Sequence, residues 1–236
     1  MQVVLKHATP EYAWNRILNV HNEYHKTLKR FGYKYDRFIP DDTRLRDMFD
    51  IEHLTDEQNK HYHDIFVNEI YDVNDLNKFD DVISNQVIPM FLRGVERLVP
   101  LLNSWGAKLP EKLYISCDYG CGGSYRYTAP HTITFRCTGF TGNHFGMTGL
   151  FMHEFVHILI EEPIIKKYHV PQDLKERIVD IICFEFFNRP VQKSFENSFA
   201  NKYITVDAIK NDLPGAVAQM MCDYLELPKY KQMETR

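Results

Sequence analysis

The sequence lacks any run of about 18 consecutive apolar residues, the length that a transmembrane helix requires. The first residues, MQVVLKHATPEYAWNR, also lack the basic segment and long apolar stretch of a signal peptide. Cysteine is scarce: the chain has five, an odd number, and none of them forms a CxxC pair. We therefore predict a cytoplasmic protein without a membrane-spanning segment, and not a secreted protein held together by disulfides.

Basic segments are missing as well. No run of five or six lysines and arginines occurs, and the formal net charge is -4. Surfaces that follow a phosphate backbone are strongly basic, so we expect no nucleic-acid partner. The hydrophobic fraction of 44% supports a sizeable core, and 236 residues suit one large domain or a catalytic unit with a helical extension.

Helical periodicity dominates the first half of the chain. The segment from Pro10 to Gly32 carries apolar residues at the spacing of one helix face, and the glycine marks its end. Thr55 is placed to cap a second helix. A third is predicted over 75–102, bent or interrupted at Pro89 and Pro100. We expect residues 1–110 to form a helical N-terminal region.

Short strands follow this region. Three segments rich in β-branched and aromatic residues, separated by glycines and a proline, are LYISC (113–117), SYRYT (124–128) and HTITFRC (131–137). They predict two or three antiparallel strands, and the third could offer its edge to an extended peptide. Helices return over 173–188 and over 206–227, the second interrupted at Pro214.

The predicted fold class is therefore α+β: mostly helical, with a small antiparallel sheet ahead of the helix that contains residues 151–162. We expect the N-terminal region (1–110) and the following region (111–236) to pack as one unit.

Two histidines stand out in the segment FMHEFVHILIEE (151–162). His153 and His157 are four residues apart, so on a helix they share a face and can bind one ion. The spacing alone is common: His21 and His25 in HNEYH have it too, and we interpret that pair as a solvated helix face. HEFVH differs because Glu154 directly follows the first histidine, where a carboxylate can take a proton from metal-bound water.

The residues around this motif are almost all apolar, which predicts a buried helix. Buried polar side chains need partners, and a bound metal ion supplies one to both histidines. A catalytic zinc usually has three protein ligands. The third histidine of the HExxHxxGxxH pattern is missing, because Ile160 and Pro163 stand where its glycine and histidine would be.

Two acidic residues compete for the role of third ligand. Glu176 begins the sequence ERIVD on the next predicted helix, and Asp180 shares its face. Glu161 lies one turn after His157. We favour Glu176, because three ligands in one line along a helix cannot easily surround an ion tetrahedrally.

HEFVH followed by ERIVD resembles the zinc-binding signature of the gluzincin metallopeptidases, a group of the zincin superfamily, over residues 150–180. The resemblance to ImmA/IrrE-like peptidases is looser, and the GxMEN motif of thermolysin-fold aminopeptidases is absent. The gluzincin resemblance implies a zincin-like fold, one Zn²⁺ per chain, and hydrolysis of a peptide or protein substrate by a zinc-bound water. The implied ligands are His153, His157 and Glu176, the general base is Glu154, and Asp180 orients His153 through its other ring nitrogen.

The transition state of such a reaction needs a second hydrogen-bond donor beside the metal. Related enzymes use a tyrosine or histidine after the third ligand or nearby, and Tyr203 and His169 are the candidates here.

The alternative function is that of a zincin-fold binding protein with a structural or non-proteolytic zinc site. The intact Glu154 favours the peptidase, because a structural zinc does not need a general base. The sequence does not specify substrate preference or oligomeric state.

Overall fold

The computed structural model describes residues 1–227 except 33, 36–38, 120–122, 137–143 and 188–197. The helices are α1 (Pro10–Lys26), α2 (Thr43–Asp50), α3 (Asp56–Ile65), α4 (Val73–Val82), α5 (Ile88–Leu98), α6 (Leu102–Trp105), α7 (His144–Ile160), α8 (Gln172–Phe187), α9 (Val206–Asn211) and α10 (Leu213–Leu225). The strands are β1 (Gln2–His7), β2 (Lys112–Asp118), β3 (Ser124–Arg126) and β4 (Thr132–Arg136). None of the described helices is long and apolar enough to cross a membrane.

Local sequence signals set several helix ends. Thr55 forms a capping box with Gln58 at the start of α3, so two backbone N–H groups that the helix leaves unpaired find acceptors. The predicted interruption near Pro214 is confirmed: Asp212 ends α9, and its side chain accepts a hydrogen bond from the Gly215 N–H at the start of α10.

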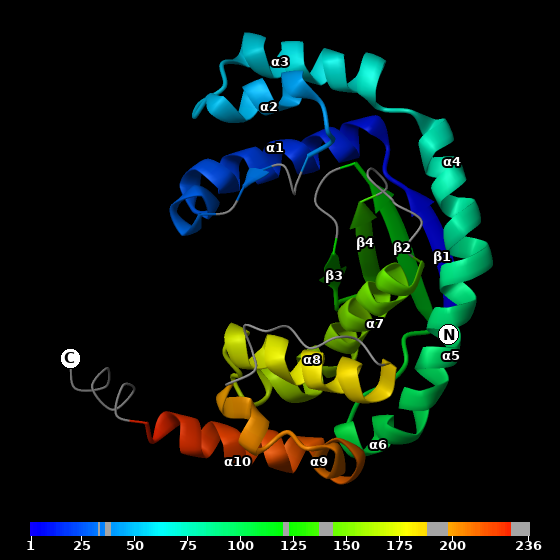
Figure 1. The fold of residues 1–236 in the computed structure, drawn as a ribbon, viewed down its shortest axis with the longest axis vertical. Coiled ribbons are helices and arrows are strands. Elements are labelled where there is room, and N and C mark those ends of the chain that lie inside the picture. Colours follow the sequence, from blue (N-terminus) through cyan, green and yellow to red (C-terminus); the bar gives the residue numbers. More distant parts are fainter. Residues whose placement is uncertain (33, 36–38, 120–122, 137–143, 188–197, 228–236) are drawn as a thin grey trace.

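The long helical segment before the sheet is also confirmed, in several pieces. A π-helical turn, η4 (Ile83–Val87), joins α4 to α5, and Pro89 lies in the first turn of α5, where its missing N–H costs nothing. A 3-10 turn, η5 (Val99–Leu101), joins α5 to α6. Residues 73–105 therefore form a nearly continuous helical path along one side of the molecule (Figure 1).

The α+β class is confirmed, but the prediction of an antiparallel sheet is wrong. The sheet is mixed, in the order β1-β2-β4-β3: β1 and β4 each pair with β2 in parallel, and only β3 pairs with β4 in antiparallel fashion. β4 takes a central position because Ile133 and Phe135 are buried, whereas the short β3 is partly exposed and forms the edge. The expected free edge on β4 is therefore wrong as well, since β4 is paired on both sides.

β1 was not predicted, and it changes the picture of residues 1–110 as purely helical. Gln2 pairs with Lys112, far along the chain, so the strand exists only through a tertiary contact.

Further contacts join the N-terminal region (1–110) to the following region (111–236). The rings of Phe91 on α5 and Phe155 on α7 meet edge to face, with centroids 5.2 Å apart, and the Trp105 indole N–H donates to the Ile209 carbonyl.

Figure 1 shows how these elements are arranged. Helices α1, α2 and α3 lie at one end of the molecule and α9 and α10 at the other. The sheet, α7 and α8 lie between them, and α4 runs beside β1, where Asp80 of α4 pairs with His7. The motif helix α7 packs on α5, α8 and the strands β3 and β4, and is therefore held from several sides.

Candidate metal centre

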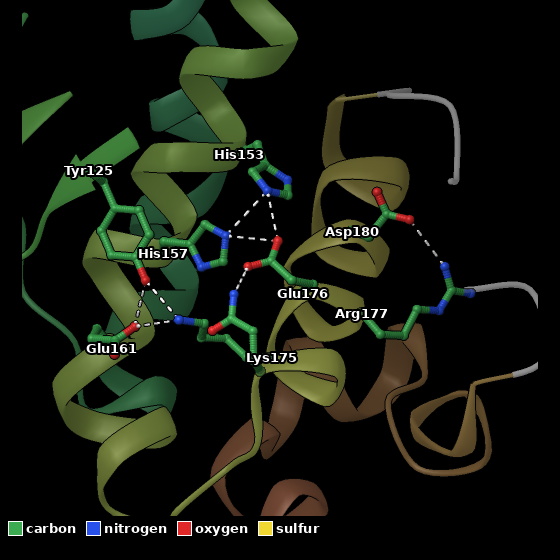
Figure 2. Close-up of polar contacts among 9 residues, drawn as sticks. Tyr125, His153, His157, Glu161, Lys175, Glu176, Arg177 and Asp180 are labelled. Atoms are coloured by element: carbon green, nitrogen blue, oxygen red, sulfur yellow. Dashed lines mark hydrogen bonds and ion pairs between the residues drawn. The ribbon is translucent and has the colours of Figure 1, made fainter. Parts of the chain in front are cut away.

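The motif helix α7 is buried, as its apolar sequence predicts. Phe151, Phe155 and Val156 are fully buried, and Phe135 of β4 stacks on Phe151 with ring centroids 3.8 Å apart. This packing fixes the rotation of α7 about its axis. Its polar face is thereby directed at α8 and at β3, the edge strand of the sheet (Figure 2).

His153, His157 and Glu176 meet on that face. The two histidine Nε2 atoms are 3.2 Å apart, and Oε2 of Glu176 lies 3.3 Å from the Nε2 of His153 and 3.4 Å from that of His157 (Figure 2). Zinc binds such atoms tetrahedrally at about 2.0–2.2 Å, which places neighbouring ligand atoms about 3.3–3.6 Å apart. The spacing of the three atoms is therefore compatible with one bound metal ion.

Hydrogen bonds alone do not account for this triangle. Each histidine Nε2 carries at most one hydrogen and an ionised carboxylate carries none, so the three contacts share at most two hydrogens. A cation attracts all three atoms at once. Among the described residues, no other group of three histidine, cysteine or acidic side chains comes as close together.

The charge state of Glu176 suits a ligand. Burial raises the pKa of this carboxyl group, but hydrogen bonds from His153 and His157 outweigh the effect and hold its pKa well below the usual value. The group is therefore ionised at neutral pH, which is the form that binds a metal. Two neutral imidazoles and one carboxylate would leave a bound divalent cation with about one net positive charge.

Glu161, the competing candidate, has other partners. Its Oε2 accepts a hydrogen bond from the Tyr125 hydroxyl at 2.9 Å and lies 3.7 Å from the Lys175 ammonium group. A π-helical turn, η6 (Glu161–Lys166), begins at this residue directly after α7. The structure thus brings Glu176, and not Glu161, to the two histidines.

Glu154 lies beside the histidines in a cavity of about 450 Å³. The cavity is lined by Gly123, Ser124, Tyr125, Leu150, His153, Glu154, His157, Gln172 and Glu176. Gly123 has a φ of +75°, which favours glycine, and a Cβ there would lie 3.5 Å from Oε1 of Glu154. A glycine at this position therefore keeps the space in front of the carboxylate open.

Tyr125 is a site residue that sequence analysis did not identify. Its ring stacks on the ring of His157 with centroids 4.6 Å apart and an interplanar angle of 3°. Burial raises the pKa of its hydroxyl, and the hydrogen bond to Glu161 raises it further, so the hydroxyl stays protonated and donates. Among 14 tyrosines nothing in the sequence singles this one out; only the approach of β3 to α7 does.

The cluster of Tyr125, Glu161 and Lys175 predicts a stability effect. The side chains of Lys175 and Glu161 are only 12% and 11% exposed, and the Lys175 ammonium also donates to the Tyr125 hydroxyl at 3.0 Å. We expect Lys175→Met to lower the free energy of unfolding of the metal-free protein by about 3 kcal/mol, because Glu161 is left buried without its cation. Urea unfolding measures the change.

The matched control for this variant is Lys166→Met. Lys166 pairs with Glu162 at 3.0 Å on the surface, where the two side chains are 47% and 62% exposed. Exposed pairs of this kind contribute less than about 1 kcal/mol. Equal losses in the two lysine variants would show that the cluster of Tyr125, Glu161 and Lys175 has no special stabilising role.

Asp180 lies on α8, one turn after Glu176, and is 1% exposed. Its Oδ2 forms an ion pair with the Arg177 guanidinium at 3.3 Å (Figure 2). The predicted role of Asp180 in orienting His153 stays a prediction.

The structure does not bring Tyr203 or His169 to the cavity. The Tyr203 hydroxyl donates to Asp223 of α10 at 2.5 Å, and this hydrogen bond is the main reason that the pKa of Asp223 is lowered. His169 is exposed in the connection between η6 and α8, and neither residue lines the cavity. No donor for the transition state is therefore assigned to these two positions.

The second histidine pair, His21 and His25, is not a solvated face as predicted. His21 is 1% exposed, and its Nε2–H donates to the Ile51 carbonyl at 2.8 Å. This hydrogen bond satisfies a buried histidine without a metal. HNEYH is thus a structural part of the N-terminal helices.

No protein-family model matches this sequence, and searches of curated proteins and of solved structures find no significant match to it.

Proposed function

We propose that this protein is a zinc-dependent peptidase whose metal ligands are His153, His157 and Glu176. The observation that carries the proposal is the triangle of three ligand atoms at 3.2–3.4 Å, with Glu154 on the wall of the same cavity. The resemblance of HEFVH and ERIVD to the gluzincin signature supports it, and with it a zincin-like fold.

Zinc in this position would supply a Lewis acid that lowers the pKa of a bound water to about 7. Glu154 would act as the general base: its carboxylate would accept one proton of the water molecule that adds to the peptide carbonyl carbon. The same carboxyl group then delivers the proton to the nitrogen of the leaving amine as the C–N bond breaks. Glu154 ends the cycle ionised, so it acts as a catalyst and is not consumed.

A peptide is the proposed substrate because the cavity adjoins the edge of the sheet. Gly123, Ser124 and Tyr125 line the cavity, and β3 is the last strand of the sheet order. An extended peptide can add to such an edge through its main chain, which holds the scissile bond in a defined direction. We therefore propose that a substrate peptide pairs with the edge of β3, and not with β4 as the sequence had suggested.

Metal removal tests the proposal. We expect the purified protein to contain about one zinc per chain and to cleave members of a peptide library. Cleavage should stop after treatment with a chelator and return when zinc is restored, because water activation depends on the ion. Elemental analysis and mass spectrometry of the peptides provide the two readouts.

Two other outcomes have definite meanings. Zinc bound at one per chain without cleavage of any peptide would favour the alternative, a zinc-containing binding protein. Failure to bind zinc, even when it is added, would contradict both functions and leave the histidines as core residues.

A further inference from the structure

Gln172 is the first residue of α8 and lies one helical turn before Glu176. Its side-chain Nε2 donates a hydrogen bond of 2.6 Å to Oε1 of Glu176. Oε2, the other oxygen of the same carboxylate, faces His153 and His157. The two oxygens of Glu176 therefore have different partners, and among the described residues Gln172 is the donor to Oε1.

We propose that Gln172 is a positioning residue that makes Glu176 a one-oxygen ligand. This inference rests on the proposed metal centre and adds a residue that the motif does not contain. A glutamate side chain has three rotatable bonds and can bind a metal through one oxygen or both. A hydrogen bond to Oε1 occupies that oxygen and fixes the rotation of the carboxylate.

A neutral amide suits this role better than a charged donor. Lys or Arg at position 172 would add a positive charge next to the cation and weaken its binding. The amide orients the carboxylate without changing the charge of the site. Gln172 is also exposed on the cavity wall, so its effect on folding is small while its effect on Glu176 is direct.

The chain contains a matched control. On α10, the Nε2 of Gln219 donates to the Oδ1 of Asp223 at 2.8 Å, with the same spacing of four residues on an exposed helix face. This pair lies outside the cavity that contains the histidines. Gln172→Met and Gln219→Met each remove one such hydrogen bond while keeping a side chain of similar length and good helix propensity.

The experiment measures the zinc dissociation constant of the full chain by competition with a chromophoric chelator. We expect Gln172→Met to bind zinc about 10- to 100-fold more weakly than the wild type, the usual effect of removing a partner of a metal ligand. Gln219→Met should bind as the wild type does. Circular dichroism of the metal-free proteins establishes that all three chains are folded.

A spectrum of the cobalt-substituted proteins separates positioning from a general structural effect. Four-coordinate Co²⁺ absorbs visible light strongly, and a fifth ligand weakens the absorption. In Gln172→Met the freed Oε1 can join the metal, so we expect lower molar absorbance than in the wild type or Gln219→Met. Gln172→Ala, which removes the whole side chain, should behave as Gln172→Met does.

Unchanged zinc affinity and an unchanged cobalt spectrum in Gln172→Met would overturn the inference. Equal weakening in both methionine variants would do so as well, because it would assign the effect to helix stability. A wild-type chain that binds no zinc would instead contradict the proposed function, so the two failures are distinguishable.

Discussion

Glu154→Gln should abolish most peptide hydrolysis while zinc stays bound. We expect kcat/KM to fall by about 10³-fold, within the range attributed to a positioned general acid and base. Glutamine keeps the size and the hydrogen-bonding oxygen of the side chain but cannot take up a proton at neutral pH. Glu154 is only 5% exposed, so a substitution of nearly equal volume is the least disruptive test of its chemistry.

The zinc content of this variant is as informative as its activity. Glu154 is not one of the three proposed ligands, so Glu154→Gln should still contain about one zinc per chain by elemental analysis. Glu162→Gln is a suitable control, because Glu162 is exposed and pairs with Lys166 on the surface. Full activity in Glu154→Gln would refute the proposed mechanism, and loss of zinc would show that Glu154 acts on the metal itself.

Glu176→Ala should lose its zinc. Removal of a partner that only orients a ligand weakens metal binding by about 10- to 100-fold, so removal of the ligand itself should exceed about 100-fold. Two histidines then remain, with the cavity open to water where the carboxylate was. A chelator competition assay measures the affinity, and peptide hydrolysis should fall with zinc occupancy.

Glu161→Ala is the comparison that identifies the third ligand. Glu161 contacts Tyr125 and Lys175 and lies one turn beyond His157, so its removal should leave zinc binding largely intact. The reverse pattern, with zinc retained in Glu176→Ala and lost in Glu161→Ala, would assign the third ligand to the first residue of η6 and not to α8.

The helix ends and the metal motif could be predicted because their causes are close together in sequence. Thr55 and Gln58 form a capping box over four residues, and Asp212 ends a helix just before a proline. His153 and His157 share a face because of helix geometry alone. Glu176 could be inferred as the third ligand because a short connection joins α7 to α8 and brings the Glu176 side chain back to the two histidines.

The sheet could not be predicted in the same way. β1 pairs with a strand more than a hundred residues later, and β4 inserts between β2 and β3 because its apolar side chains are buried there. The order of the strands depends on which faces of the sheet the helices cover, and a local sequence pattern does not indicate which faces these are. The antiparallel prediction failed because it paired strands by their order along the chain.

The surroundings of the candidate site were decided in the same manner. Tyr125 stacks on His157 only because the edge strand β3 lies against α7. The Tyr203 hydroxyl forms a hydrogen bond with Asp223, outside the cavity. By itself, the sequence determined that His153 and His157 share one face of an apolar helix, because 3.6 residues per turn bring positions four apart close together. Only the tertiary structure decided which ring stacks on His157 and which strand borders the cavity, because each of these contacts depends on the packing of elements far apart in the chain.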